Sequence, residues 1–393
     1  MLNSKDFKMF KTLQYFLIII FATLLTSCSS ISSLKFWGND EANLDEPKTL
    51  EKISNAQNII NNWDLSFDGE NSLGNFTPSF IGNNVFFADS SGNIKSINSS
   101  SGKINWQKDI NFLSTGVSAG FGILVVADID GNIISLDQNN GSVLWTLNVK
   151  GEVLAPPVID AKFVIVKTGS GELIALNKLS GDIEWSYRSK LPILTIRGSS
   201  SPVIDNNLVY VSFDNGRLGV FDLNSGYLVW DGAISYVSGS SELENLIDSD
   251  SSPVIDGGLV YTTNYQGNIN IFDIAQKRSV WQSEFSSFYS PLLFRGLVIL
   301  IDANSNLKTF FNKNLKQSWK TDDYLNRDLS NPVSFNNYIV VGDFEGYVHM
   351  IDPLTGITIA RKKISKKPIK KIISRSKNFY VVDEAFNLYS LSI

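Results

Sequence analysis

A repeat of about 40 residues constrains the fold of this chain more than any other feature. Tryptophans mark it at Trp106, Trp145, Trp185, Trp230, Trp281 and Trp319, with intervals of 39, 40, 45, 51 and 38 residues. Glycines keep the same spacing at Gly92, Gly131, Gly171, Gly216 and Gly267, and return two periods later at Gly346. Asn304-Ser305-Asn306 and Asn387 occupy the remaining turns, so that the chain holds eight units.

Each unit consists of short apolar runs separated by turn residues. In the second unit, Asp130-Gly131-Asn132 separates the runs Ile123–Ala127 and Ile133–Leu136, and a third run, Val143–Leu147, surrounds Trp145. Turns of this type join the strands of β-hairpins. A second turn pattern, Asx-x-x-x-Gly, recurs at Asn98–Gly102, Asp137–Gly141, Asn177–Gly181, Asp222–Gly226 and Asp352–Gly356.

Four strands per unit and eight units predict an all-β fold, an eight-bladed β-propeller with four-stranded antiparallel blades. A β-solenoid is the alternative, although its repeats are usually shorter and poorer in tryptophan. Recurring tryptophans at one strand position indicate packing between blades and not ligand sites. The last unit has three strands, near Ile369–Ile373, Phe379–Val382 and Leu388–Ile393, and lacks a tryptophan strand. We expect Asn61–Leu65, around Trp63, to supply that strand and close the ring.

The N-terminus has the pattern of an export signal. Three lysines, Lys5, Lys8 and Lys11, precede an apolar run from Tyr15 to Leu25 that is too short for a mature membrane span. The next residues complete Leu25-Thr26-Ser27-Cys28, which resembles the lipobox of bacterial lipoproteins. The alternative is an ordinary signal peptide followed by a free thiol.

The lipobox resemblance implies cleavage before Cys28 and lipidation of its sulfur. Ser29 at the next position favours the outer membrane over the inner one, with the protein on the periplasmic face. We therefore expect a signal peptide over residues 1–27, a lipidated cysteine with a flexible tether over 28–60, and the propeller over 61–393. A short helix near Lys48–Asn61 is compatible with the composition of the tether.

The composition fits a folded protein that does not bind nucleic acid. Charged residues make up 19% of the chain and hydrophobic residues 43%. There are 34 Lys and Arg against 39 Asp and Glu, a formal net charge of −5. Nucleic-acid binding calls for a basic surface, which this balance argues against.

Two consecutive connections between units are longer than the others. Trp185 is 17 residues from Pro202 and Trp230 is 23 from Pro253, whereas Trp145 is 11 from Pro156. Such connections leave one face of a propeller, so we expect the two insertions, Leu191–Ser200 and Ala233–Ser252, to lie side by side. Insertions on one face of a repeat array usually mark the binding face.

The second insertion is acidic, with Glu242, Glu244, Asp248 and Asp250. It is compatible with a solvated loop, with capping of the next strand, or with weak cation binding. Ca²⁺ takes six to eight oxygen ligands, so one pair of carboxylates does not predict a metal site.

The two insertions also carry a family resemblance. Leu194–Pro202, Ser240–Pro253 and Val340–Tyr347 are similar to segments of the BamB lipoproteins of the outer-membrane β-barrel assembly (BAM) machinery. The similarity covers roughly residues 60–393 and the lipobox, whereas the repeats alone indicate only a PQQ-like, quinoprotein-type propeller.

The BamB resemblance implies a non-catalytic scaffold that docks the barrel subunit BamA through a POTRA domain and assists the folding and insertion of barrel proteins. Residue by residue, it points to Leu194, Ile196 and Arg197 in the first insertion and to Asp248 and Asp250 in the second. Ile196 stands where the family usually has leucine. Other BAM subunits and unfolded outer-membrane proteins are the further partners implied. The basic segment Arg361–Lys377 has no counterpart in the resemblance; a solvated blade edge or a phospholipid-facing surface would account for it.

A periplasmic PQQ-dependent dehydrogenase is the alternative function. Those enzymes resemble the repeat but need a Ca²⁺ site, a catalytic aspartate and commonly a vicinal cysteine pair, whereas Cys28 is the only cysteine. The single histidine, His349, lies in a strand run and lacks a nucleophile elbow or fellow zinc ligands. A WD40-type scaffold lacks its signatures, and a carboxylate-only hydrolase stays open. We expect no catalytic residue, no cofactor and no metal.

Overall fold

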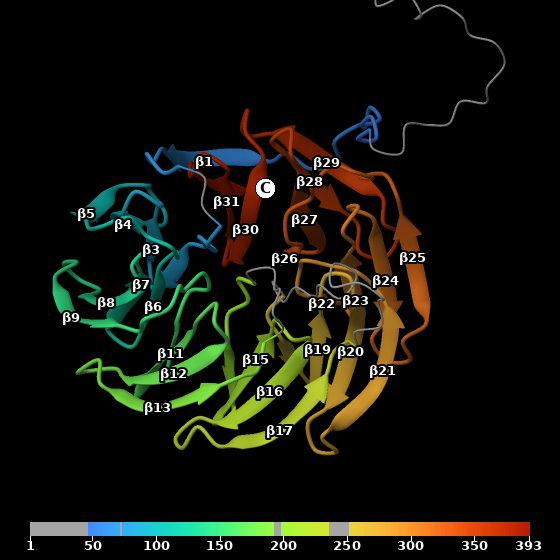
Figure 1. Cartoon of the computed structure of the whole chain (residues 1–393). Helices are drawn as coiled ribbons and strands as arrows, with labels where there is room; N and C mark the ends of the chain where they lie inside the picture. The colour runs from blue at the N-terminus through green and yellow to red at the C-terminus, as the bar shows by residue number, and fades with distance from the viewer. Residues whose placement is uncertain (1–45, 71–72, 192–197, 236–250) are drawn as a thin grey trace, which may run out of the picture. The chain divides into compact units, whose positions relative to one another are not determined.

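The computed structural model describes residues 46–70, 73–191, 198–235 and 251–393. Its contacts divide the chain into two units, Met1–Glu46 and Pro47–Ile393. In the second unit, eight four-stranded antiparallel sheets surround a common axis (Figure 1). The described residues contain no helix, and none of their elements is a helix able to cross a membrane. The predicted eight-bladed propeller is confirmed.

Each of the first seven blades is built from four strands in sequence order. Blades 1 to 4 are β2 (Ser79–Ile81), β3 (Asn84–Ala88), β4 (Asn93–Asn98), β5 (Ile104–Asp109); β6 (Ser118–Gly120), β7 (Ile123–Ala127), β8 (Asn132–Asp137), β9 (Val143–Asn148); β10 (Val158–Ile159), β11 (Phe163–Lys167), β12 (Glu172–Asn177), β13 (Ile183–Arg188); and β14 (Val203–Asp205), β15 (Leu208–Phe213), β16 (Arg217–Asp222), β17 (Leu228–Ala233). Blades 5 to 7 are β18 (Val254–Asp256), β19 (Leu259–Thr263), β20 (Asn268–Asp273), β21 (Arg278–Glu284); β22 (Leu292–Phe294), β23 (Leu297–Ile301), β24 (Leu307–Phe311), β25 (Gln317–Thr321); and β26 (Val333–Phe335), β27 (Tyr338–Gly342), β28 (Tyr347–Ile351), β29 (Thr358–Lys363).

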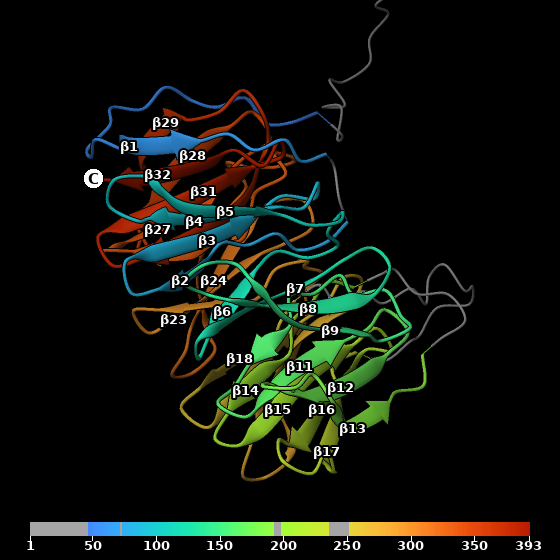
Figure 2. The same ribbon diagram turned by 90° about the vertical axis from the view of Figure 1, so that its left-hand side faces the viewer.

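The eighth blade joins the two ends of the ring. Its inner strands are β30 (Ile369–Arg375), β31 (Asn378–Asp383) and β32 (Leu388–Ser392), and its outer strand is β1 (Ile60–Leu65). β1 pairs with β32 from Ile60 opposite Ser392 to Leu65 opposite Leu388. Figures 1 and 2 show this blade next to blade 1. The predicted closure is confirmed, and it removes two free sheet edges.

Residues 47–59, which we call the N-terminal strap, run along the outer edge of blade 7. Ala56 N–H donates to the Ile359 carbonyl at 2.7 Å, and Lys48 N–H donates to the Leu325 carbonyl at 2.9 Å. The helix considered near Lys48–Asn61 is wrong, because strap amides bond to the blades instead of to a helical turn. The second unit begins at Pro47, so residues 47–60 of the expected tether belong with the ring.

The two sequence repeats meet in one contact between neighbouring blades. The Trp106 ring lies on Gly141 of the next blade, and its Nε1–H donates to the Gln138 carbonyl at 3.1 Å. A Cβ at Gly141 would come within 2.8 Å of that ring. The same contact joins Trp63, Trp145, Trp185 and Trp319 to Gly102, Gly181, Gly226 and Gly356. Tryptophan and the Asx-x-x-x-Gly turn are therefore the two halves of the interface between blades.

In five blades, an aspartate at the end of the second strand holds the turn that leads to the third strand. Asp128 Oδ1 accepts the Asn132 amide N–H at 2.8 Å, four residues ahead. The same i to i+4 bond is made by Asp89, Asp302, Asp343 and Asp383. Each carboxylate satisfies turn donors that the strand ladder leaves free, as Asx turns do.

Candidate docking surface

The predicted docking residues themselves lie outside the described part of the chain. Leu194, Ile196 and Arg197 fall within residues 192–197, and Asp248 and Asp250 within 236–250. The predicted lipidation site, Cys28, also lies outside it. What the structure describes is the base of each insertion, where the chain returns to the next blade: Ser199–Ser201 for the first and Ser251–Ser252 for the second.

The base of the first insertion is held by a buried ion pair. Ser200 is fully buried, and its hydroxyl accepts from Lys167 Nζ at 2.8 Å. Lys167 lies at the end of β11 in blade 3, where it is 3% exposed. Its ammonium also donates to the Ser212 carbonyl at 3.0 Å and lies 3.4 Å from Asp214 Oδ1, both in blade 4.

The base of the second insertion is also buried and hydrogen-bonded. Ser251 is 1% exposed, and its hydroxyl accepts from Thr263 Oγ1 at 2.8 Å. At the start of the same insertion, the Ser235 hydroxyl donates to Asn264 Oδ1 at 2.9 Å. Both ends of this insertion are thus attached to β19 and the turn that follows it.

One hydrogen bond connects the two insertions directly. The Ser201 amide N–H donates to Ser252 Oγ at 2.9 Å. Ser201 is four residues from Arg197, and Ser252 is two residues from Asp250. The expectation that the two insertions are neighbours therefore holds at their bases.

The two insertions leave the same face of the ring. Each follows the outer strand of one blade and leads to the inner strand of the next, β13 to β14 and β17 to β18. The β25–β26 connection belongs to the same class, and it contains Leu325, which the strap contacts through Lys48. The strap therefore begins on the face that carries the insertions.

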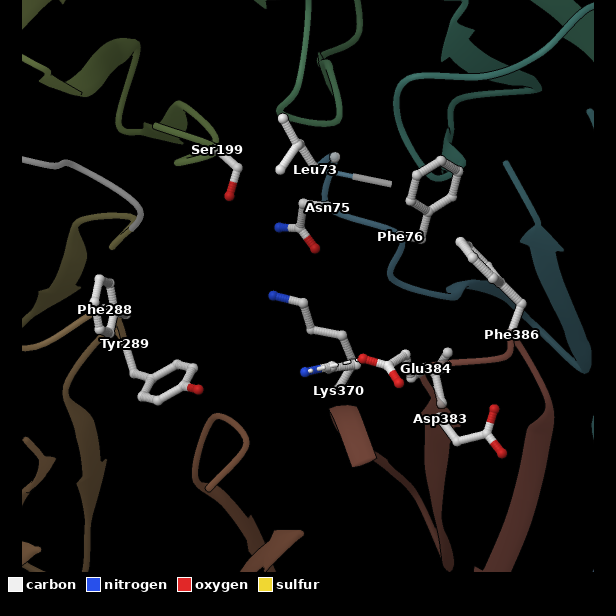
Figure 3. A pocket seen from close by; sticks show the side chains of 13 residues that line it. Leu73, Asn75, Phe76, Ser199, Phe288, Tyr289, Lys370, Asp383, Glu384 and Phe386 are labelled. Atoms are coloured by element: carbon white, nitrogen blue, oxygen red, sulfur yellow. Dashed lines mark ion pairs between the residues drawn. The ribbon is translucent and has the colours of Figure 1, made fainter. Parts of the chain in front are cut away.

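A pocket of about 560 Å³ opens beside the base of the first insertion (Figure 3). Figure 3 shows Phe76 and Phe386 on one side of it and Phe288 and Tyr289 on the other. Lys370 reaches in between them, 3.6 Å from Glu384 and 3.3 Å from Asp328. Ser199 forms part of the lining. The Lys370 charge is therefore balanced by two carboxylates, and four aromatic side chains contribute to the lining.

His349 belongs to a buried network beneath the strap. Its Nε2 lies 3.0 Å from Asp343 Oδ2, and its Nδ1 accepts from Arg361 Nε at 3.0 Å, so the neutral ring carries its proton on Nε2. Arg361 also donates to the Glu51 carbonyl of the strap at 2.8 Å. Arg327 donates to Asp343 at 2.7 Å and to the Lys48 carbonyl at 2.9 Å.

The charges of this network agree with a structural role. Burial has the largest effect on the pKa of His349 and lowers it, although the Asp343 carboxylate raises it in part. Burial alone would raise the pKa of Asp343, but hydrogen bonds from His349 and Arg327 bring it below its ordinary value. Burial also raises the pKa of Tyr324, whose ring packs against His349, to about 12. His349 is therefore neutral at pH 7 and is occupied on both nitrogens.

Metal ligands do not gather in the part of the chain that the structure describes. No group of three or more His, Cys, Asp or Glu side chains in those residues is placed to hold an ion. The buried carboxylates instead accept backbone and side-chain donors, as Asp343 and Asp383 do.

Sequence reasoning missed the residues that support the insertions. Lys167 precedes the turn of blade 3, and the other blades have an uncharged residue at this position: Ala88, Ala127, Phe213, Thr263, Ile301, Gly342 and Val382. Alignment of the eight units would have singled it out. The Ser201–Ser252 bond had no comparable signal, because its partners are 51 residues apart.

Comparison with known proteins identifies the family. The sequence model described as outer membrane protein assembly factor BamB matches residues 90–321. The chain is 31% identical over 362 residues to BamB of Yersinia pestis, covering 88% of this chain and 90% of the relative. This chain belongs to the BamB family. BamB of Escherichia coli K12 is 29% identical over 359 residues, 88% of this chain and 90% of the relative.

Solved structures share the propeller. The crystal structure of BamB from Moraxella catarrhalis superposes with a TM-score of 0.79 and 24% identity, over 85% of this chain and all of that one. A quinohemoprotein alcohol dehydrogenase from Comamonas testosteroni superposes with a TM-score of 0.67 and 12% identity, over 86% of this chain and 77% of the enzyme. Such low identities show a common fold alone, so dehydrogenase activity is not inferred from the structural similarity.

Proposed function

We propose that this chain is a non-catalytic scaffold lipoprotein of the outer-membrane protein assembly machinery. It docks a POTRA domain of the BamA-like subunit and, with other BAM subunits, assists the folding and insertion of barrel proteins. The observation that carries the proposal is the hydrogen bond between Ser201 and Ser252, which joins the bases of two long insertions on one face. Membership of the BamB family supplies the biological setting.

The docking surface combines apolar area with charge. Leu194 and Ile196 would each contribute about 1.5–3 kcal/mol if fully buried by the partner. Arg197 is the residue type found most often among interface hot spots, together with Trp and Tyr. Asp248 and Asp250 would orient the partner by charge, or pair with Arg197 and order the surface before docking.

Cys28 would anchor the ring to the periplasmic face of the outer membrane. The residues between Cys28 and the strap, 29–46, span at most about 65 Å when fully extended. Two or more acyl chains would give stable anchoring where one would be marginal. The outer-membrane setting agrees with the assembly-factor name of the relatives.

Scaffolding accounts for the described chemistry better than catalysis does. The only histidine has both nitrogens engaged by Asp343 and Arg361, which leaves none for a substrate. The only cysteine is the predicted lipidation site. A PQQ-dependent dehydrogenase would instead need a quinone site with a bound Ca²⁺ and a catalytic aspartate, and among the described residues no group of three or more His, Cys, Asp or Glu is placed to hold an ion.

Binding of single variants to the POTRA-bearing subunit tests the proposal. Arg197→Ala should weaken binding by about 2 kcal/mol, roughly thirtyfold, and Arg197→Lys should restore little if the contact is bidentate. Arg278→Ala, at an exposed arginine of β21, is the matched control and should bind normally. Wild-type affinity in both Arg197→Ala and Asp248→Ala would show that docking uses another surface.

A double-mutant cycle separates the two roles of Arg197. Coupling between Arg197 and Asp248 or Asp250 in the stability of the isolated protein would indicate an internal ion pair. Coupling that arises only in the affinity for the subunit would indicate that the arginine contacts the partner.

A further inference from the structure

Lys167 breaks the repeat at a position that contacts the base of the first insertion. The residue before the turn of each blade is uncharged in the other seven blades, from Ala88 to Val382. Blade 3 has a lysine there, and its side chain is 2% exposed. A buried lysine needs a partner for its charge and acceptors for its three N–H groups.

Blade 4 and the connection that leads to it supply these acceptors. Lys167 Nζ lies 2.8 Å from Ser200 Oγ, 3.0 Å from the Ser212 carbonyl and 3.4 Å from Asp214 Oδ1. Asp214 is 2% exposed and supplies the opposite charge. The ammonium thus has three acceptors, and one of them, Ser200, belongs to the base of the first insertion.

Stability alone does not explain such a pair. A buried ion pair is often no more stabilising than apolar residues of the same volume, because both charges lose their hydration. The pair instead fixes geometry, because three acceptors hold the ammonium in one position relative to Ser200, Ser212 and Asp214. The pair lies across blades 3 and 4 and fixes Ser200, three residues from Arg197.

The same constraint reaches the second insertion. Ser201 follows Ser200 and donates its N–H to Ser252 Oγ at 2.9 Å. Ser252 is two residues from Asp250, and its carbonyl accepts from Ser290 Oγ at 2.8 Å. A series of hydrogen bonds therefore runs from Lys167 through the described bases of both insertions.

We propose that Lys167 is a positioning residue for the docking surface. Its ammonium fixes Ser200, and the Ser201–Ser252 bond sets the spacing between the bases of the two insertions. The inference rests on the proposed function, because it assumes that these two insertions bind the partner together. It assigns no contact between Lys167 and the partner.

Variants of the network test this inference against a matched control. Ser200→Ala removes the acceptor, and Lys167→Met paired with Asp214→Asn removes both charges without leaving one unpaired. Ser330→Ala is the control, because Ser330 is a buried serine at the base of the short β25–β26 connection, where its hydroxyl accepts the Gly342 N–H at 2.9 Å.

We expect the Ser200 variant and the double variant to bind the POTRA-bearing subunit about tenfold more weakly, and Ser330→Ala to bind as wild type does. Amide exchange should accelerate in residues 191–202 of the two network variants and stay unchanged in residues 297–311. Wild-type affinity in the double variant would overturn the inference, as would an equal loss in Ser330→Ala.

The two hypotheses fail in different ways. If the wild-type protein itself does not bind the subunit, the proposed function is wrong, and amide exchange then decides the role of Lys167. Unchanged exchange at residues 191–202 in the double variant would exclude positioning by Lys167 whatever the partner is.

Discussion

The contact that closes the ring provides a quantitative test of the fold. Trp63 lies on β1, the outer strand of blade 8, and its ring packs on Gly102 of blade 1. Its Nε1–H donates to the Ser99 carbonyl at 2.9 Å, and its ring centroid lies 5.9 Å from that of Tyr380. Replacing Trp63 by alanine would remove these three side-chain contacts, two of which join blade 8 to blade 1, and would leave the backbone pairing of β1 with β32 in place.

The expected loss of stability follows from these contacts. A buried Trp→Ala change costs about 3–5 kcal/mol, and because Trp63 is half-buried we expect about 2–4 kcal/mol. Trp63→Phe keeps an aromatic ring but not the hydrogen bond, whose loss alone costs about 1 kcal/mol. Trp106→Ala is the internal control, since Trp106 makes the same contact with Gly141.

Urea unfolding followed by circular dichroism would measure the effect. The midpoint should fall in the order wild type, Trp63→Phe, Trp63→Ala, and Trp106→Ala should lose a similar free energy of unfolding to Trp63→Ala. A wild-type midpoint in Trp63→Ala would refute the reasoning, because it would mean that the closing contact contributes nothing to the ring.

Three further results are expected. Cys28→Ala should leave an unprocessed or soluble exported form, and fractionation that finds it bound as firmly as wild type would contradict lipid anchoring. Because burial lowers the pKa of His349, the folded state takes up its proton less readily than the unfolded state, so stability should decline as the pH falls below about 6.5; urea titrations of His349→Gln should show a flatter pH profile. Protein supplied with PQQ and Ca²⁺ should show neither quinone absorbance nor dehydrogenase turnover, and stoichiometric quinone binding with turnover would count against the scaffold.

The repeat made most of the fold predictable. Tryptophans and Asx-x-x-x-Gly turns carry local patterns, and the unpaired strand around Trp63 identified the closure because only one blade lacked its fourth strand. The strap was not predicted, because its hydrogen bonds go to residues about 270–310 positions away, such as Leu325 and Arg361. Local sequence patterns do not indicate hydrogen-bond partners that are so far away along the chain.

The candidate site was predictable only in part, for a similar reason. Unusual connection lengths revealed the two insertions, and the family resemblance selected residues within them. The support beneath them depends on Lys167, and a lysine in a strand ordinarily indicates an exposed side chain. Its burial is explained by contacts in the folded ring, where Asp214 and Ser212 of blade 4 accept from its ammonium.

The most direct test of the central claim is isolation of the lipidated protein from membranes, followed by identification of the chains that co-purify with it. The account predicts a barrel protein with POTRA domains, retained by wild type and by Arg278→Ala and reduced in Arg197→Ala. Co-purification of the wild type with no POTRA-bearing chain, or equal recovery of that chain with Arg197→Ala, would contradict the proposed docking surface.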